Sequence, residues 1–175
     1  MHREMTPEEF DSEFLNLWHQ SAFRLETLPH YESELEDAHR RRFYAGEHVD
    51  TKWLDPWRQM LTQVSGRGGR MARVRVLAEP LTSYLLFETG VIYPVSVQHG
   101  EDVRILVTDR PEAFGPDFWL LDNQVAHMIY SPAGEWLGVL LDDDTDVVAQ
   151  AQERASALLA KAVPLKQYLT KENIR

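Results

Sequence analysis

Residues 71–78, MARVRVLA, are the stretch that decides the fold. Val74, Val76 and Ala78 fall on one side of an extended chain, and this alternation predicts a strand. Residues 79–97 then show apolar side chains at helical spacing, and residues 102–107, DVRILV, predict a second strand. A strand, a helix and a strand in succession favour a parallel pair of strands joined by a crossover.

Three short apolar stretches follow this unit along the chain. They cover residues 117–121, 125–130 and 135–141. The links between them contain the sequences DN and PAG, which predict tight turns and an antiparallel meander. A last helix is expected to begin at Asp144 or Thr145 and to end before Pro164. We therefore expect residues 67–175 to form an α/β (α+β) domain with a mixed β-sheet of about five strands flanked by helices.

The sequence of residues 1–66 predicts mostly helices. Thr6, Pro7 and Glu9 form a helix start with a capping box, and this helix is expected to run to about residue 20. A short strand is expected over residues 22–27, and two further helices over 31–45 and 53–64. We therefore expect a mostly helical N-terminal region that packs on the sheet domain.

The composition excludes several classes of protein. The chain has 175 residues, no cysteine and a formal net charge of −10. Without cysteine there are no disulfides, no thiolate metal sites and no cysteine nucleophile. No apolar run approaches the length of a membrane span, and the first residues lack the apolar segment of a signal peptide. We expect a soluble cytoplasmic protein that binds no membrane.

Basic residues concentrate in one segment of the chain. Residues 40–75 carry nine basic and three acidic side chains, whereas the segments on either side are acidic. This segment could dock on the acidic remainder of the same chain, which we favour, or it could bind an anion. Nucleic-acid binding through residues 40–75 is a further alternative, although the net negative charge argues against it.

The familiar motifs of catalysis and metal binding are missing from the sequence. The seven histidines show neither H-E-x-x-H nor H-x-H spacing. The acidic run at residues 142–146 lacks the glycine and glutamate of an EF-hand loop and suits a helix start instead. The glycines at residues 66–69 precede a strand, whereas a phosphate loop precedes a helix. No G-x-S-x-G is present. We expect no metal and no cofactor, and we favour a non-catalytic role.

Charged side chains placed within predicted strands are the main candidates for a site. At the carboxyl ends of parallel strands they could form a polar cleft, the usual ligand position in open α/β sheets. Alternatively they form structural ion pairs on a solvated face. The candidates for binding a ligand or partner are Arg24, Glu26, Arg73, Arg75, Glu79, Tyr84, Glu101, Arg104 and Asp122.

Four stretches together resemble an actinobacterial family of uncharacterised proteins. They are AFRLET at residues 22–27, RVRVLAEPLTSYLLFE at 73–88, GEDVRIL at 100–106 and DFWLLD at 117–122. The resemblance implies a gene neighbourhood with helix-turn-helix regulators, in clusters that look like toxin–antitoxin or developmental-control modules. It implies no catalytic residues, because no activity is established for the family.

A second resemblance concerns the C-terminal part. The succession VRIL, FWLLD, a strand and an acidic helix before AVP looks like half of a phospholipase D-like fold. That superfamily uses an H-x-K signature, and no histidine of this chain is followed by x-Lys. The resemblance thus implies a degenerate domain without phosphodiesterase chemistry.

Three functional hypotheses follow. The first is a non-catalytic regulatory module that binds a partner protein such as a helix-turn-helix regulator, or a second copy of itself as a homodimer. The second is an enzyme or sensor that binds a small anionic ligand through Arg24, Arg75 and Arg104 with Glu26 and Glu101. The third is nucleic-acid binding through residues 40–75.

Overall fold

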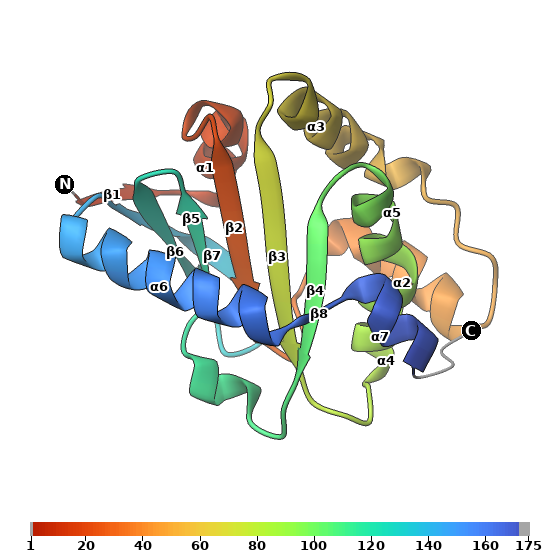
Figure 1. Cartoon of the computed structure of the whole chain (residues 1–175). Coiled ribbons are helices and arrows are strands. Elements are labelled where there is room, and N and C mark those ends of the chain that lie inside the picture. The colour runs from red at the N-terminus through yellow and green to blue at the C-terminus, as the bar shows by residue number, and fades with distance from the viewer. Residues whose placement is uncertain (1, 172–175) are drawn as a thin grey trace.

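The computed structural model describes residues 2–171 and shows a single mixed sheet of eight strands (Figure 1). Their order across the sheet is β1-β7-β6-β5-β2-β3-β4-β8. The central strands β2, β3 and β4 are parallel, and all other neighbouring pairs are antiparallel. The strands are β1 (His2–Met5), β2 (Ser21–Glu26), β3 (Arg70–Leu77), β4 (Asp102–Val107), β5 (Phe118–Leu121), β6 (Gln124–Tyr130), β7 (Trp136–Asp142) and β8 (Val163–Pro164).

The expected strand-helix-strand unit and meander are present, but the expectation of about five strands was too low. The edge strands β1 and β8 contain four and two residues, too few to show an alternating pattern. The short strand expected over residues 22–27 is present as β2, and it lies between β5 and β3 in the centre of the sheet. Residues 1–66 therefore contribute β1 and β2 to the same sheet as the strands of residues 67–175.

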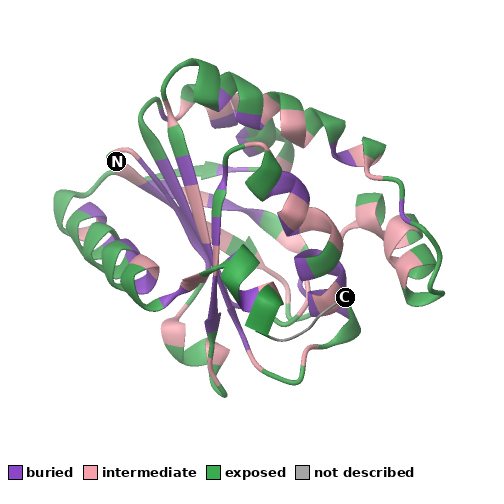
Figure 2. Cartoon of the chain, turned by 45° about the vertical axis from the view of Figure 1, so that its right-hand side comes forward, coloured by how far each residue is buried: buried purple, intermediate pink, exposed green. Residues whose placement is uncertain are grey.

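Helices cover both faces of this sheet. The helices are α1 (Pro7–Glu13), α2 (Glu34–Tyr44), α3 (Asp55–Gly66), α4 (Ser83–Phe87), α5 (Tyr93–Gln98), α6 (Thr145–Lys161) and α7 (Leu165–Lys171). Short 3₁₀ turns span Phe14–Asn16, Lys52–Leu54 and Pro111–Phe114. The helix α6 packs on one face, and the purple of the strands in Figure 2 shows how deeply the centre of the sheet is buried.

Two helices differ from the sequence prediction in instructive ways. The capping box of Thr6 and Glu9 starts α1 as expected, but the α-helix ends at Glu13 and continues only as a 3₁₀ turn. The single helix expected over residues 79–97 is interrupted by a π-helical turn, Glu88–Ile92, between α4 and α5. Such π turns are frequent at functional sites.

The alternation of β2 and β3 sorts their side chains onto two different faces. Leu25, Val74 and Val76 join the buried apolar cluster under α6. Every second residue points the other way, so Arg24 and Glu26 share the opposite face with their register partners on β3, Arg73 and Arg75.

Two apolar clusters flank these charges on that opposite face. The first lies under α1 and α3 and includes Trp18, Leu61 and Trp119. The second lies by α5 and α7 and includes Tyr93 and Ile105. A band of charge therefore separates two hydrophobic cores on one face of the sheet.

Among the described residues, no helix combines the length and the apolar character needed to cross a membrane.

Candidate functional site

The charged band forms a compact network that we call the polar cluster. Its members are Arg24, Glu26, Arg73, Arg75, Glu88, Glu101 and Asp117. Six of the seven are buried, and the seventh, Arg73, exposes only 11% of its side chain. Ionised groups are almost never buried so completely unless they are paired, and here three guanidinium groups face four carboxyl groups.

Arg73 and Glu26 connect two strands at the centre of the cluster. Arg73 Nη1 donates to Glu26 Oε1 at 2.7 Å, and its Nε donates to Glu101 Oε1 at 2.8 Å. Tyr93 Oη donates to the other oxygen of Glu26 at 2.8 Å. Burial alone would raise the pKa of Glu26, but the surrounding guanidinium groups, Arg73 first, lower it to about 2. Glu26 therefore stays ionised at neutral pH.

Arg75 is the most buried arginine, with no exposed surface. Its Nε donates to Glu88 Oε2 at 2.9 Å, and Tyr84 Oη donates to the other oxygen of Glu88 at 3.2 Å. Its guanidinium carbon lies 5.1 Å from the centre of the Tyr31 ring. Burial raises the pKa of Glu88 although Arg75 opposes this shift, so Glu88 accepts a proton more easily than Glu26.

Arg24 links the cluster to Asp117, which directly precedes β5. Its Nη2 donates to Tyr130 Oη at 2.7 Å and contacts Asp117 Oδ2 at 3.4 Å. Asp117 also accepts from the backbone N–H and the hydroxyl of Thr27, at 2.9 and 2.8 Å, and from Tyr31 Oη through a very short contact. Asp117 thus ties the end of β2 to β5.

Four tyrosines line the cluster. Burial raises the pKa of each of them, so all four phenols remain protonated and can donate. They are Tyr31, Tyr84, Tyr93 and Tyr130. The ring of Tyr31 lies 5.3 Å from that of Tyr130 and 6.3 Å from that of Tyr84, so three of the rings form one continuous wall.

Several polar atoms in the cluster have no hydrogen-bond partner. They are Arg24 Nη1, Arg75 Nη1, Arg75 Nη2 and Glu101 Oε2. Arg75 Nη2 lies 2.9 Å from Glu88 Oε2, but this contact has the distance of an ion pair without the alignment of a hydrogen bond. An unsatisfied buried donor costs about 1–3 kcal/mol. The protein therefore holds guanidinium donors in its interior that make no aligned hydrogen bond with its own side chains.

The structure brings together six of the nine candidates expected from the sequence. Arg24, Glu26, Arg73, Arg75 and Glu101 are cluster members, and Tyr84 contacts Glu88. These charges lie against a covered face, so the solvated face considered as the alternative is absent among these strands.

The remaining three candidates lie elsewhere. Glu79 is exposed and accepts from Tyr168 Oη at 2.8 Å. Arg104 pairs with Asp102 at 2.9 Å and donates to the carbonyl of Leu159, on the α6 side. Asp122 accepts the backbone N–H groups of residues 19–21, which lead into β2. Arg104 therefore does not lie with Arg24 and Arg75, and the expected anion site cannot include it.

Sequence reasoning did not select Asp117, Tyr31, Tyr93 or Tyr130. Asp117 stands beside the strand-forming FWLL, where it could have been noted as a charge at a strand start. The tyrosines come from a loop, a helix and the end of β6, and only the tertiary fold brings them to one place.

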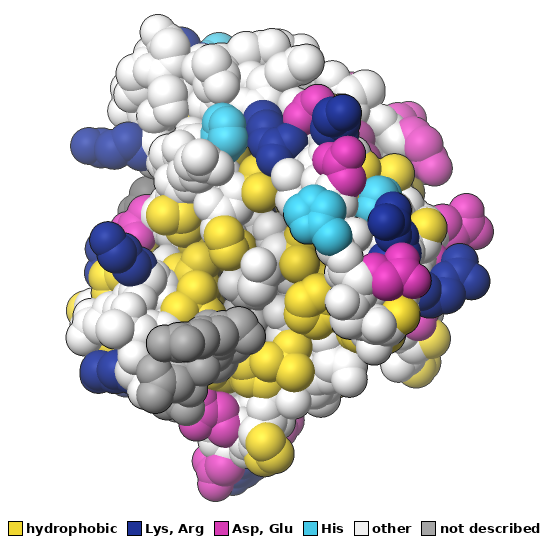
Figure 3. All heavy atoms as spheres, turned by 90° about the vertical axis from the view of Figure 1, so that its right-hand side faces the viewer, with side chains coloured by type: hydrophobic (Ala, Val, Ile, Leu, Met, Phe, Trp, Pro, Cys, Tyr) yellow, Lys and Arg dark blue, Asp and Glu magenta, His cyan; other side chains and the backbone are white. Residues whose placement is uncertain are grey.

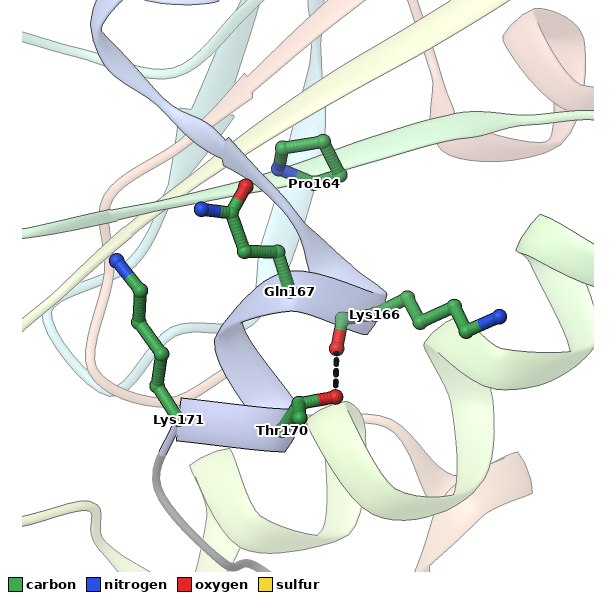
Figure 4. A pocket seen from close by; sticks show the side chains of 5 residues that line it. All are labelled: Pro164, Lys166, Gln167, Thr170 and Lys171. Atoms are coloured by element: carbon green, nitrogen blue, oxygen red, sulfur yellow. Dashed lines mark hydrogen bonds between the residues drawn. The ribbon is translucent and has the colours of Figure 1, made fainter.

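The hollows of the described residues include one beside the polar cluster and one on α7. One, of about 250 Å³, lies at the carboxyl ends of β2 and β3 between Thr27, Leu77 and Leu85, next to residues of the polar cluster. The other, of about 490 Å³, lies on α7 (Figure 4). There the Thr170 hydroxyl bonds to its own helix at Lys166, and the lysine side chains point outward. We assign no binding role to the hollow on α7.

The basic segment at residues 40–75 is largely used inside the molecule. Arg40 pairs with Asp37, Arg42 with Glu47 and Arg58 with Asp55, while Arg73 and Arg75 are enclosed in the cluster. Arg67 donates to the carbonyls of Leu15 and Trp18. Figure 3 shows basic, acidic and histidine side chains interspersed on the side that carries α2. No group of three His, Asp or Glu residues within 2–171 is arranged to hold a metal ion.

The solved structures that resemble this fold include TrmBL2 and NucT. TrmBL2, described as an archaeal chromatin protein with a novel mode of DNA binding, matches with a TM-score of 0.51 and 12% identity. The match covers 94% of this chain and 55% of TrmBL2, so the chain spans about half of that protein's length. NucT from Helicobacter pylori matches with a TM-score of 0.50 and 14% identity, over 94% of this chain and 98% of NucT. At these identities the likeness concerns the fold alone.

No curated protein matches the sequence. A family profile, in contrast, matches residues 8–170. This range includes the whole polar cluster and every strand except the edge strand β1. The chain therefore belongs to the family described as Domain of unknown function (DUF6879).

Proposed function

We propose that the protein is a non-catalytic binding module that encloses a small polar molecule at the polar cluster. The observation that carries this proposal is Arg75, which is completely buried and keeps two guanidinium nitrogens without hydrogen-bond partners. A network kept only for stability would gain by replacing such groups with apolar side chains of similar volume, because buried ion pairs contribute little net stability.

The charge balance limits the class of ligand. Three guanidinium groups already face four carboxyl groups, so the cluster has no excess positive charge to offer a polyanion. The unpartnered atoms comprise guanidinium donors on Arg24 and Arg75 and one acceptor on Glu101. A neutral or singly charged molecule with carbonyl or carboxylate oxygens, and a flat part that packs on the tyrosine wall, satisfies these groups best.

Access requires movement of the segment between β2 and α3. The members of the cluster are too deeply buried for a ligand to reach them in this conformation. The hollow at the carboxyl ends of β2 and β3 marks the nearest approach, because Thr27 lines it and also binds Asp117. Ligands commonly bind at this edge of open α/β sheets.

The proposal excludes hydrolysis of phosphodiesters. We regard the sheet as a phospholipase D-like half domain, an interpretation supported by the sequence resemblance, and no histidine of the chain occurs in an H-x-K triplet. Bis(p-nitrophenyl) phosphate should therefore be left intact by the protein. Its turnover at a rate that scales with protein concentration would contradict the non-catalytic assignment.

A thermal-unfolding experiment tests ligand binding. The wild type is heated with acetate, benzoate, uracil or pyrophosphate, beside the double variant Arg75→Met/Glu88→Gln and the control Arg104→Met. The double variant removes a buried charge pair together, and the control removes an arginine from the neighbouring strand outside the cluster.

We expect at least one of the three small planar probes to stabilise the wild type and the control, by about 2.7 kcal/mol at a hundredfold excess over Kd. The same probe should leave the double variant unchanged, and pyrophosphate should have no effect. Two results would count against this site. One is equal stabilisation of the wild type, the control and the double variant by a planar probe. The other is that no planar probe stabilises any of the three proteins.

Partner-protein binding is a second proposal, and it has one structural observation in its favour. Leu137 and Ile129 are 52% and 44% exposed on the neighbouring strands β7 and β6. Exposed apolar side chains on adjacent strands suit a protein partner. The partner we expect is a helix-turn-helix regulator from the gene neighbourhood. Co-elution of such a regulator with the wild type but not with Leu137→Glu would support this role, and separate elution from the wild type would oppose it.

A further inference from the structure

The helix α2 has the properties of a movable cover beside the polar cluster. None of its residues, Glu34–Tyr44, is buried, in contrast to α3, α4, α5 and α6. Its attachments are side-chain contacts: Arg40 lies over the ring of Tyr84, Phe43 packs on Phe87, and His39 stacks on Trp53. A helix with so little buried apolar surface opens at lower cost than the rest of the fold.

One carboxylate on the inner surface of α2 is poorly accommodated. Glu36 Oε2 is buried and has no hydrogen-bond partner. The strongest charge acting against its ionised form is Glu88, which belongs to the polar cluster. Burial, with Glu88 as the second cause, raises the pKa of Glu36 to about 7, although Arg40 opposes the shift.

The other charged groups near Glu36 are few. They are Arg40 and Asp37 on α2 itself, Glu88 on the π-helical turn and Glu26 on β2, with the phenols of Tyr84 from α4 and of Tyr44 at the end of α2. His30 contacts both Arg40 and the ring of Tyr84, so its effect must be separated by experiment.

We propose that Glu36 is a proton-controlled latch: in its neutral form it holds α2 closed over the polar cluster, and in its ionised form it releases α2. The geometry that points to this is a carboxyl oxygen that is buried without a hydrogen-bond partner on a helix that has no buried residue. The latch regulates access to the ligand site and in that sense rests on the proposed function, but it can be measured without any ligand.

The direction of the pH effect follows from linkage. When α2 opens, Glu36 returns to water and its pKa falls toward the ordinary value of 4.5. The closed state therefore binds more protons between these two values, and closure weakens as the pH rises through this window. A difference from 4.5 to about 7 changes the open-to-closed ratio on the order of 100-fold, and the ratio levels off above about pH 7.

Amide hydrogen exchange of residues 34–44 tests the latch. Protection factors, corrected for the intrinsic rate at each pH, are compared at pH 5, 6, 7 and 8 for the wild type, Glu36→Gln, Glu34→Gln and His30→Gln. Glutamine mimics the neutral acid, and Glu34 is an exposed glutamate on the same helix.

In the wild type, protection of α2 should fall about 40-fold between pH 5 and 7 and about twofold more by pH 8, while α6 stays unchanged. Glu36→Gln should keep the low-pH protection throughout, and the Glu34→Gln and His30→Gln variants should behave as the wild type. A pH-independent wild type, or a Glu36→Gln variant that still opens with rising pH, would overturn the latch. Loss of the pH response in His30→Gln alone would assign the switch to His30 and overturn it as well.

These outcomes are separate from the test of ligand binding. A working latch with no stabilising probe would leave α2 as a pH-sensitive cover and remove the ligand site. A stabilising probe with a pH-independent α2 would leave the ligand site and remove the latch.

Discussion

Removing the charge of Arg75 alone should be far more damaging than removing Arg75 and Glu88 together. In Arg75→Met the carboxylate of Glu88 stays buried, keeps only Tyr84 as a hydrogen-bond donor and loses its nearest positive charge. Breaking a buried pair from one side typically costs 3–5 kcal/mol, so we expect a loss of about 4 kcal/mol at pH 7. For a chain of this length that corresponds to a fall in Tm of about 8–16 °C.

The double variant Arg75→Met/Glu88→Gln should recover most of this loss. The glutamine still accepts from Tyr84 and brings no charge, so the double variant should lie within about 1.5 kcal/mol of the wild type. The coupling energy between the two positions would then be at least about 2 kcal/mol, a value found only for groups in direct contact. Urea unfolding followed by far-UV circular dichroism measures all four proteins, the fourth being Glu88→Gln.

The pH dependence of the single variant gives an independent check. Without Arg75 the pKa of Glu88, already raised by burial, rises further, and a protonated Glu88 no longer needs a cation. The folded state then binds more protons than the unfolded state, so the deficit of Arg75→Met should shrink as the pH falls toward 5. A loss of unfolding free energy below about 1 kcal/mol in Arg75→Met at pH 7 would refute the view that the polar cluster is closed to water. A double variant as unstable as the single one would refute it as well.

Two further predictions concern connections outside the cluster. Asp122→Ala removes the acceptor of the backbone N–H groups of residues 19–21 and places alanine at a φ of 49°, so urea unfolding should show a loss of about 2 kcal/mol, whereas Asp122→Asn should lose less. Gly134→Ala puts a methyl group 2.6 Å from the carbonyl oxygen of His30, at a residue whose φ is 88°. We expect the free energy of unfolding to fall by about 2–3 kcal/mol. Amide exchange should also become faster at Glu32, whose N–H donates to the carbonyl of Gly134. A loss under 0.5 kcal/mol in Asp122→Ala or Gly134→Ala would contradict the contact concerned.

The local part of the fold could be predicted because short-range patterns determine it. The valines of β3 identify its apolar side, and Asp144, one of the two expected starting residues, caps α6. The edge strands could not be predicted, since the two residues of β8 have no pattern of their own and pair only because α6 delivers them beside β4. The length of α1 was overestimated because the aromatic spacing continues through a 3₁₀ turn.

The candidate site could be predicted only in part. Arginines alternating with valines on β3 indicated a charged face, but the sequence could not tell whether water or protein covers it. That depends on helices supplied by residues 34–66 and 83–98, which are distant along the chain from β2 and β4. Arg104 shows the limit most clearly, because one residue of register sends it to the α6 side, away from Arg73 and Arg75.

Native mass spectrometry of the protein isolated directly from its own cells tests the central claim most directly. The wild type and Arg104→Met should each carry the added mass of one small molecule, released on denaturation and absent from Arg75→Met/Glu88→Gln. A wild-type protein with no added mass, even after incubation with a concentrated small-molecule extract of those cells, would contradict the account. So would an added mass that the double variant retains.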